Sequence, residues 1–526
     1  MSNYLYTNRN IILVFLISLF LCLIGIGAYP IYILDEAKNA EAAREMLVNN
    51  DYIVPTFNNI LRTDKPPLHY YFMILGYKIF GVNPFGARFF SAIFGTFTMV
   101  TSFYFIRKFS GKVVAKIFIL IIWSSIFFIQ EFHLAVPDPY LIFFISCALW
   151  LFYNFHKTEN HKSLWFMYIL FGLGVLTKGP VAILLPGLIC LLFFIITKSL
   201  TIKNILKYRP FLGLLILILI SLPWYLLVHK ETHGAWTQGF FLEHNINRFA
   251  TEKEGHGGLF LITWGFVLLG LMPFSFFSFY AFKNAYKNRK DSLLIFSSIA
   301  SLVFIAFFSI SNTKLPNYTM PCYPFLALVI SKGIFQFFKS KNRNLHIDIV
   351  IITITLLSVA LPIAGKFALM QENALKNVSN IAFWLIPTSI ATIIGAFLYF
   401  KNQLKNAFLT IVGGWMLLTP ILFLVIYPKI TIHNPVEKVK SIIKNENHIA
   451  AYKRFDAAFP INFQQTFMVF QTEEEVTSYF DQFPEGFLIT NNRDIEPLKT
   501  RDDLILIFEE KALFESHTTR VFKKRQ

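Results

Sequence analysis

Long apolar runs constrain the fold of this chain more than any other feature. A helix needs about twenty apolar residues to cross a bilayer, and about thirteen runs approach that length. They lie near residues 11–29, 85–106, 113–130, 139–155, 164–177, 180–197, 210–228, 259–282, 292–311, 317–338, 346–366, 381–400 and 407–427. Only 15% of the 526 residues are charged, whereas soluble domains carry about 25%. The sequence therefore predicts an α-helical polytopic membrane protein with about thirteen transmembrane helices.

Basic residues are concentrated in every second connection between these runs. The basic connections carry Arg107, Lys108 and Lys112; Lys157 and Lys162; Lys198, Lys203, Lys207 and Arg209; Lys283, Lys287, Arg289 and Lys290; Lys339, Lys341 and Arg343; and Lys401 and Lys405. By the positive-inside rule these connections are cytoplasmic. The net charge of +17 is thus a topology signal, and we expect no nucleic-acid partner. The first apolar run lacks a small-residue cleavage site, so we expect an uncleaved first helix.

The composition changes after about residue 430, from apolar to mixed polar and charged. We expect two domains: a multi-spanning domain over 1–430, whose outward loop 30–84 carries the chemistry, and a small extracytoplasmic α/β domain over 431–526. Alternating or apolar patterns predict strands at 448–454, 465–471, 486–491 and 503–509, and an amphipathic helix at 473–483. No catalytic pattern occurs in this second domain, which favours a structural or positioning role.

The first outward loop begins with an acidic pair. Asp35 and Glu36 follow the first apolar run directly, and carboxylates are costly in lipid, so they should face water or a polar cavity. Asp35 can cap a short interfacial helix over 36–48, and Pro66-Pro67 opens a second one over 68–80. Two simpler interpretations stay open: Asp35 as an N-cap only, and Asp64-Lys65 as a surface ion pair.

Further charged residues fall in the other outward loops. They are Glu131, His133, Asp138, Lys178, Glu243, His244, Arg248, His256 and Lys314. Asp138 lies between two prolines at the mouth of a span, and lysines on this side run against the positive-inside rule. Each residue alone is also explained as a solvated loop residue. Together they predict a cavity that binds an anion and handles a proton.

The ordered set of motifs resembles the lipid A aminoarabinose transferase family. More broadly it is similar to the polyprenol-phosphate-sugar-dependent membrane glycosyltransferases of the C-type fold, related to dolichyl-phosphate-mannose protein mannosyltransferases. The resemblance covers roughly the first 330 residues, and rests on Asp35-Glu36, Glu41 to Met46, Asp51 to Pro55, Asp64 to Pro67, Phe80-Gly81, Phe85 to Arg88, Pro137 to Pro139, Leu176 to Pro180, Glu243-His244, Arg248-Phe249, His256 and Lys314 to Tyr318.

This resemblance implies an enzyme of the cell inner membrane that modifies the cell envelope. Such an enzyme moves a sugar from undecaprenyl phosphate to lipid A, another glycan or another acceptor at the outer face. The resemblance implies catalytic roles for Asp35, Asp138 and Glu36, with Asp35 as the group that accepts or orients the acceptor's proton. It places the substrate-binding residues at Lys65, Lys178, Arg248, Lys314, Tyr318, Arg44 and Lys38. A single displacement at the anomeric carbon would invert its configuration.

Two departures from the family pattern affect the phosphate and metal sites. Lys38 stands where family members carry Arg, and Asp64 where they carry Glu. Lysine cannot reproduce the bidentate fork of arginine, so the phosphate clamp differs. The resemblance also raises a divalent metal held by Asp64 and His256, although no metal-binding spacing supports it. Catalysis by a carboxylate without metal stays open.

Three alternatives remain at this point. A protein O-mannosyltransferase-like enzyme would share the fold and use a Ser or Thr acceptor, so product analysis separates the two. A lipid-linked sugar transporter or flippase would predict charged residues within spans, broken helices and matching halves, and no repeated half is visible. A scaffold that only presents the C-terminal domain leaves the outward charges unexplained. The sequence leaves the donated sugar and the acceptor unidentified.

Overall fold

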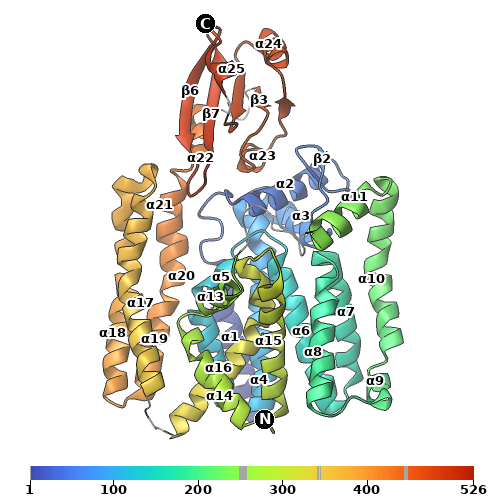
Figure 1. Cartoon of the computed structure of the whole chain (residues 1–526), viewed down its shortest axis with the longest axis vertical. Coiled ribbons are helices and arrows are strands. Elements are labelled where there is room, and N and C mark those ends of the chain that lie inside the picture. The colour runs from blue at the N-terminus through green and yellow to red at the C-terminus, as the bar shows by residue number, and fades with distance from the viewer. Residues whose placement is uncertain are drawn as a thin grey trace.

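The protein is a helical bundle with a small sheet domain at one end (Figure 1). The computed structural model describes residues 2–247, 258–340, 343, 345–443, 448–493 and 495–525, with side chains omitted for 2–8, 244–247 and 497. The sheet domain stands at the end of the bundle opposite to the N-terminus. Helices α2 and α3 lie at this end, between the sheet domain and the long helices of the bundle (Figure 1). We call this the domain-bearing end of the bundle.

All thirteen predicted apolar runs overlap helices. The bundle helices are α1 (Ser2–Leu23), α4 (Pro84–Ser124), α5 (Ile126–Glu131), α6 (Asp138–Thr158), α7 (His161–Lys178), α8 (Val181–Ile196), α9 (Ile202–Lys207), α10 (Pro210–Glu231), α13 (Leu261–Gly270), α14 (Ser278–Lys287), α15 (Ser292–Ile310), α16 (Tyr323–Ser340), α17 (Leu345–Met370), α18 (Ile386–Phe400), α19 (Leu404–Met416), α20 (Leu418–Pro420) and α21 (Tyr427–Thr431). Within the described residues, eight helices are long and apolar enough to cross a membrane, or up to nine with the bent α13–α14 pair. The polytopic helical class is confirmed, and the count of thirteen crossings stays a prediction.

Helix α4 consists of two arms that meet at Gly111. The backbone there is non-helical, with φ of 84° and ψ of 169°, a conformation that glycine adopts without a steric penalty. Gly95 of the first arm packs directly on the ring of Phe132, the residue after α5: a Cβ at Gly95 would lie 2.4 Å from that ring. The chain therefore reverses at Gly111, in agreement with the basic connection expected there.

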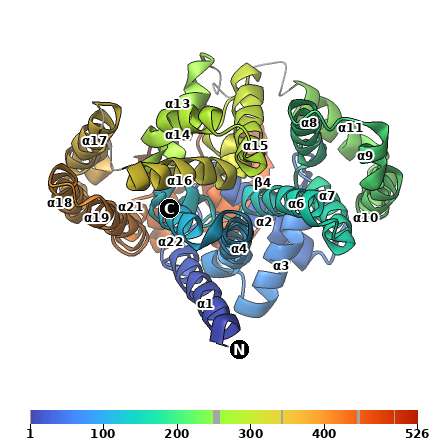
Figure 2. The same ribbon diagram turned by 90° about the horizontal axis from the view of Figure 1, so that it is seen from below.

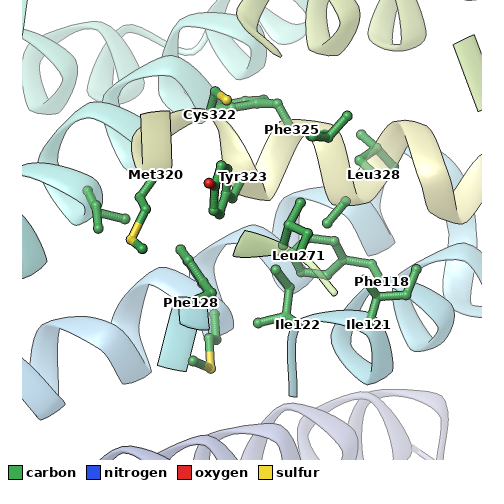
Figure 3. Packing of buried hydrophobic residues seen from close by; sticks show 14 of the residues in the cluster. Phe118, Ile121, Ile122, Phe128, Leu271, Met320, Cys322, Tyr323, Phe325 and Leu328 are labelled. Atoms are coloured by element: carbon green, nitrogen blue, oxygen red, sulfur yellow. The ribbon is translucent and has the colours of Figure 1, made fainter. Parts of the chain in front are cut away.

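Aromatic and aliphatic side chains join α4 and α5 to α16 in the interior of the bundle. Figure 3 shows Phe118, Ile121, Ile122, Phe128, Leu271, Met320, Cys322, Tyr323, Phe325 and Leu328 in one buried cluster. The rings of Phe128 and Tyr323 have centroids 5.9 Å apart. This packing fixes the end of α5 next to the 3₁₀ segment η3 (Pro316–Cys322) that precedes α16, and both segments contribute to the site described below.

The C-terminal domain is a five-stranded mixed sheet in the order β4-β3-β5-β7-β6. Its strands are β3 (Ile449–Tyr452), β4 (Met468–Phe470), β5 (Phe487–Thr490), β6 (Leu504–Lys511) and β7 (Thr518–Lys524), and its helices are α22 (Pro435–Ile442), α23 (Ala458–Phe463), α24 (Glu473–Gln482) and α25 (Glu496–Lys499). The four predicted strands and the helix at 473–483 are confirmed. Strand β7 was missed; it pairs antiparallel with both β5 and β6 and closes the sheet between them.

Helix α2 (Leu34–Val48) differs from its prediction in two respects. Its N-cap is Ile33, so Asp35 lies inside the first turn and does not cap the helix. The helix is also not exposed to lipid along one face, because ten of its residues, Glu36, Ala37 and the eight from Asn39 to Met46, are buried. Helix α23 of the C-terminal domain packs on it. Helix α3 (Leu68–Phe80) begins where Pro66-Pro67 predicted.

A hairpin ties the first loop to the C-terminal domain. Strands β1 (Thr56–Phe57) and β2 (Ile60–Leu61) are joined by Asn58 and Asn59, both with positive φ, a typical choice for such turns. Asn58 accepts a hydrogen bond from the Phe467 amide at 2.7 Å and donates one to the Phe467 carbonyl at 2.9 Å. Glu45 of α2 accepts from the Asn58 amide and the Asn59 amide. Besides the direct packing of α23 on α2, the hairpin thus links Glu45 of α2 to Phe467 of the C-terminal domain.

Asn58→Ala is expected to loosen the docked domain. It leaves the buried Phe467 amide without its acceptor, which costs about 1–3 kcal/mol. Limited proteolysis of the purified protein should release the C-terminal domain faster than from the wild type. Asn59→Ala is the matched control, since Asn59 also has a positive φ but its side chain makes an exposed 3.2 Å bond to Thr466, which is not buried. Equal proteolysis of both variants would refute the anchoring role of Asn58.

Candidate active site

Asp35 lies on α2 at the domain-bearing end, with 53% of its side chain exposed. Partial burial acts to raise its pKa, but the positive charges of Lys65, Arg62 and Lys178 outweigh this effect and hold the pKa of Asp35 below its ordinary value. The carboxylate therefore stays ionised at neutral pH. Two cations of the loop between α2 and α3, Arg62 and Lys65, and Lys178 at the end of α7 act on one exposed carboxylate, which is the arrangement expected of an anion-binding site.

Arg62 is the organising cation of this cluster. Its guanidinium lies 3.1 Å from the Asp64 carboxylate and 3.8 Å from that of Asp35. It also donates to the Tyr70 hydroxyl at 3.1 Å and to the Asn39 side chain at 3.4 Å. The indole of Trp236 donates to the Arg62 carbonyl at 2.9 Å. Arg62 is buried, so its charge acts in a medium of low dielectric.

His69 and Asn39 form the buried polar contacts beneath the charged cluster. The His69 ring is hydrogen-bonded to the Asn39 side-chain oxygen at 3.1 Å, and Asn39 donates to the Asp35 carbonyl at 2.8 Å. Burial, with the positive charges of Lys65 and Arg62 next, lowers the pKa of His69 well below its ordinary value. His69 is therefore neutral, and it positions α2 against the loop that carries Arg62.

A second charged group lies beside the first. Lys178 at the end of α7 donates to Asp138 at the start of α6, at 2.6 Å, and its ammonium lies 5.0 Å from the centre of the Tyr318 ring. Glu131, at the end of α5, is buried. Burial raises the pKa of Glu131 above its ordinary value, and the negative charge of Asp138 adds to this effect. Lys178 thus faces both carboxyl groups and the region of Asp35.

The remaining predicted lysines lie in different surroundings. Lys65 is buried and acts electrostatically on Asp35. Lys314 is buried and donates to the Ser311 carbonyl at 2.6 Å, so its ammonium stabilises its own loop. Lys38 lies on α2, half-buried. Tyr318 contacts both Lys178 and Phe308.

Glu36 and Arg44 are held by partners within the protein. Arg88 uses all five of its N–H donors: two go to the Glu36 carboxylate at 2.7 and 2.9 Å, and three go to the carbonyls of Ile26, Tyr29 and Pro30. Arg44 is bidentate to Glu41. Both pairs are buried. The geometry favours structural roles for Glu36 and Arg44 over the catalytic and binding roles expected from the sequence.

The described residues give little support to a metal site. Asp64, one expected ligand, is ion-paired with Arg62, and a nearby guanidinium opposes binding of a second cation. Within the described ranges, no group of three or more His, Cys, Asp or Glu could hold a metal ion. The other expected ligand, His256, and the expected phosphate ligand Arg248 lie outside the described residues.

Sequence reasoning missed Arg62, Asn39, His69 and Trp236 as parts of the cluster. A signal for Arg62 was available, because it is an arginine in an outward loop, where the positive-inside rule disfavours it. Asn39 and His69 gave no signal, since single polar residues on short helices are common. The structure brings Asp35, Lys65, Asp138, Lys178 and Tyr318 together, and their catalytic and binding roles stay predictions.

The chain is similar to several known proteins. Residues 64–225 match the family described as dolichyl-phosphate-mannose-protein mannosyltransferase. An uncharacterized protein of Aquifex aeolicus (strain VF5) is 30% identical over 364 residues, which cover 68% of this chain and 71% of that protein. Undecaprenyl phosphate-alpha-4-amino-4-deoxy-L-arabinose arabinosyl transferase 2 of Pseudomonas fluorescens (strain Pf0-1) is 30% identical over 59% of this chain and 57% of its own length. The corresponding arabinosyl transferase of Shewanella sediminis (strain HAW-EB3) is 28% identical over 345 residues, which cover 65% of this chain and 62% of that protein.

The chain belongs to the aminoarabinose transferase-like family of polyprenol-phosphate-sugar-dependent membrane glycosyltransferases. Its aligned part spans about three fifths of the named transferases, 57% and 62% of their lengths. The crystal structure of ArnT from Cupriavidus metallidurans bound to undecaprenyl phosphate superposes with a TM-score of 0.79 over 97% of both chains, at 17% identity. The apo structure gives 0.80 over 99% of this chain and 100% of that one. At this identity the likeness shows a shared fold, including the C-terminal domain.

Lys178→Gln is expected to lower kcat/KM of this protein about 10- to 150-fold. The ammonium of Lys178 makes a charged hydrogen bond, and such a bond contributes about 1.5–3 kcal/mol. The change removes the cation that faces both Asp138 and the Asp35 region. Initial rates of transfer from a polyprenyl-phosphate sugar measure it. Lys376→Gln, an exposed lysine on η4 (Asn373–Leu385), is the control and should keep the wild-type rate. An unchanged rate for Lys178→Gln would remove Lys178 from the donor site.

Proposed function

We propose that this chain transfers a sugar from undecaprenyl phosphate to lipid A or a related envelope acceptor, at the outer face of the inner membrane. The named relatives are transferases of 4-amino-4-deoxy-L-arabinose carried on undecaprenyl phosphate, so a pentose of this type is the proposed donor sugar. The orientation rests on the basic connections, which lie at the opposite end of the bundle from the site.

The observation that carries the proposal is the ionised Asp35 among Lys65, Arg62 and Lys178. A sugar phosphate needs positive charge where the leaving phosphate gains negative charge. It also needs a group that orients the attacking acceptor. The cluster offers both within one site, at the end of the bundle where a lipid-carried phosphate would lie.

The proposed reaction is a single displacement at the anomeric carbon. An acceptor oxygen forms the new bond to this carbon while the bond to the phosphate oxygen of the donor breaks. Undecaprenyl phosphate leaves with the electron pair, and Lys65 and Lys178 stabilise its charge. Where the acceptor is a hydroxyl, Asp35 takes its proton; where it is a phosphate, Asp35 orients it. Asp138 holds the ammonium of Lys178 in place, and the product has inverted configuration.

A protein acceptor is the second candidate, because residues 64–225 match the protein mannosyltransferase family. The two candidates share the donor chemistry and differ only in the product. The small C-terminal domain covers α2, so any acceptor must approach Asp35 beside this domain.

The test is glycosyl transfer in membranes that contain the wild-type chain. Membranes receive radiolabelled undecaprenyl-phosphate 4-amino-4-deoxy-L-arabinose or radiolabelled polyprenyl-phosphate mannose, and are extracted into lipid A, glycan and protein fractions. Label from the pentose donor in lipid A supports the proposal. Label in protein from the mannose donor supports the second candidate instead. Label that stays entirely on both carriers, in membranes where a known transferase works, would refute both.

A further inference from the structure

The connection between β6 and β7, residues 512–517, fastens the C-terminal domain to the bundle. The C-terminus, where β7 ends, lies on the far side of the domain, so this connection lies on the side that faces the bundle (Figure 1). Leu513 is buried in the same apolar cluster as the bundle helices. Glu372, between α17 and η4, accepts from the Lys511 ammonium at 2.8 and 2.9 Å and from the Phe514 amide at 3.1 Å.

The bundle helices that hold this connection are not those that carry the active site. Helices α17, α18 and α19 form a group at the periphery of the bundle, whereas α2 lies near its centre (Figure 2). Segment η4, which follows Glu372, packs on α17 and so belongs to the peripheral group. The β6–β7 connection therefore starts from one side of the bundle, and its other contacts lead to α2.

His517, the last residue of the connection, joins two carboxylates. Its Nε2 lies 3.2 Å from Asp456, and its Nδ1 lies 3.0 Å from Glu515 of the same connection. The hydrogen bonds to Asp456 and then to Glu515 outweigh partial burial and raise the pKa of His517 to about 9. The ring is therefore charged at neutral pH and donates from both nitrogens. A neutral ring has a single N–H and can serve only one carboxylate.

Asp456 passes this contact on to α23 and α2. It lies just before α23 and accepts a hydrogen bond from the Ala458 amide at 2.8 Å. Helix α23 packs on α2, and its Phe459 shares a buried cluster with alanines of α2. Asn462 of α23 donates to the carbonyl of Ile31, three residues before α2, at 2.6 Å. His517 is thus connected to the helix that carries Asp35.

We propose that His517 is a positioning residue for the glycosyl transfer: it clamps the β6–β7 connection to Asp456, and α23 in turn holds α2 and Asp35 in place. This inference rests on the proposed function, because it gives Asp35 the role stated there. The clamp joins the connection, which Glu372 fastens to the periphery of the bundle, to the helix that packs over the site. Without it α23 can shift on α2, and a misplacement of about 1 Å at a reacting group costs about 100-fold in rate.

The experiment measures transfer by the purified full-length protein from undecaprenyl-phosphate 4-amino-4-deoxy-L-arabinose to lipid A. At neutral pH His517→Gln should lower kcat about 10- to 100-fold, and hydrogen–deuterium exchange of α2 should become faster. His517→Arg keeps the charge and several donors, so it should restore most of both. Gel filtration checks that each variant is folded.

The pH profile separates positioning from a general loss of structure. Because the pKa of His517 is raised, the clamp is complete below about pH 6.5, the ordinary value for His, and is lost as the pH rises through about 9. The kcat of the wild type should fall in this upper range, whereas His517→Arg should show no fall there. An equal fall in both, or a wild-type kcat for His517→Gln, would overturn the proposal.

Two further variants complete the test. Asp456→Asn keeps an oxygen for the Ala458 amide but removes the charge that faces the ring; it should match His517→Gln, and the double variant should lose no more than either alone. Lys524→Gln is the control, since it removes the exposed ion pair with Asp481 at the far end of β7, and it should behave as the wild type.

Exchange in α2 needs no substrate, so it distinguishes failure of the clamp from failure of the proposed function. A wild type that transfers no sugar would refute the proposed function and, with it, the role of His517 in transfer. Faster exchange of α2 in His517→Gln would then still establish the clamp itself. Unchanged exchange of α2 in both His517→Gln and Asp456→Asn would overturn the clamp, whatever the activity of the wild type.

Discussion

Replacing Asp35 with Asn is expected to lower kcat about 100- to 10,000-fold, the range typical of a lost general base. The variant keeps the size of the side chain and removes only its charge and its ability to accept a proton. Because Asp35 is half exposed and is not the N-cap of α2, the fold should be unaffected. Transfer from an undecaprenyl-phosphate sugar in membranes, at matched expression, measures the effect.

Two controls sharpen this prediction. Asp51→Asn changes another exposed carboxylate of the same loop, one that accepts hydrogen bonds from two backbone amides, and it should leave the rate unchanged. The pH profile is the second. Since cations lower the pKa of Asp35, its carboxylate persists below about pH 3.9, the ordinary value for Asp. Activity should therefore show no acidic limb from Asp35 between pH 5 and 8. Full activity of Asp35→Asn would move the base to Asp138 or Asp64.

Replacing Arg88 with Met is expected to cause the largest loss of stability. Glu36 and Arg88 are both fully buried, and removing one partner of such a pair costs about 3–5 kcal/mol because the other charge stays uncompensated. Thermal unfolding in detergent, followed by tryptophan fluorescence, should show a clear drop in Tm. Arg343→Met is the control, because its ion pair with Asp348 is exposed to solvent and such pairs contribute little.

A double variant separates the two sources of this loss. Arg88→Met/Glu36→Gln removes the stranded charge, while the Gln oxygen can still accept from the Ala135 amide, as Glu36 does. It should recover part of the Tm lost in Arg88→Met. If the double variant is as unstable as Arg88→Met, the cost comes instead from the carbonyls of Ile26, Tyr29 and Pro30, which lose their donor.

Much of the site was predictable because charge patterning reports topology. The positive-inside rule assigned Asp35, Lys65, Asp138 and Lys178 to one side of the membrane, and the structure brings these four residues together. Helix positions were predictable for a similar reason, since apolar runs must match the thickness of a bilayer. Where a loop folds back on the bundle was not predictable by this rule.

The neighbours Asp35 and Glu36 show what sequence adjacency conceals. Successive residues of a helix point about 100° apart. Asp35 therefore faces the cations of the site, while Glu36 faces Arg88, 52 residues later in the chain. No local pattern identifies such a partner. Arg62 is similar, because its contacts with Asp64, Asn39 and Tyr70 depend on how the loop is folded.

The contact between Asn58 and Phe467 has a consequence for how the protein folds during its synthesis. These residues are 409 positions apart, and chains grow at about 5–20 residues per second. The loop that carries Asp35 is thus finished about 20–80 s before the segment that covers α2 is made. During this time the helices can enter the membrane, yet α2 lacks its contact with α23 of the C-terminal domain. A ribosome that stalls late therefore leaves an inserted chain whose first loop is open to proteases, and only a complete chain closes it.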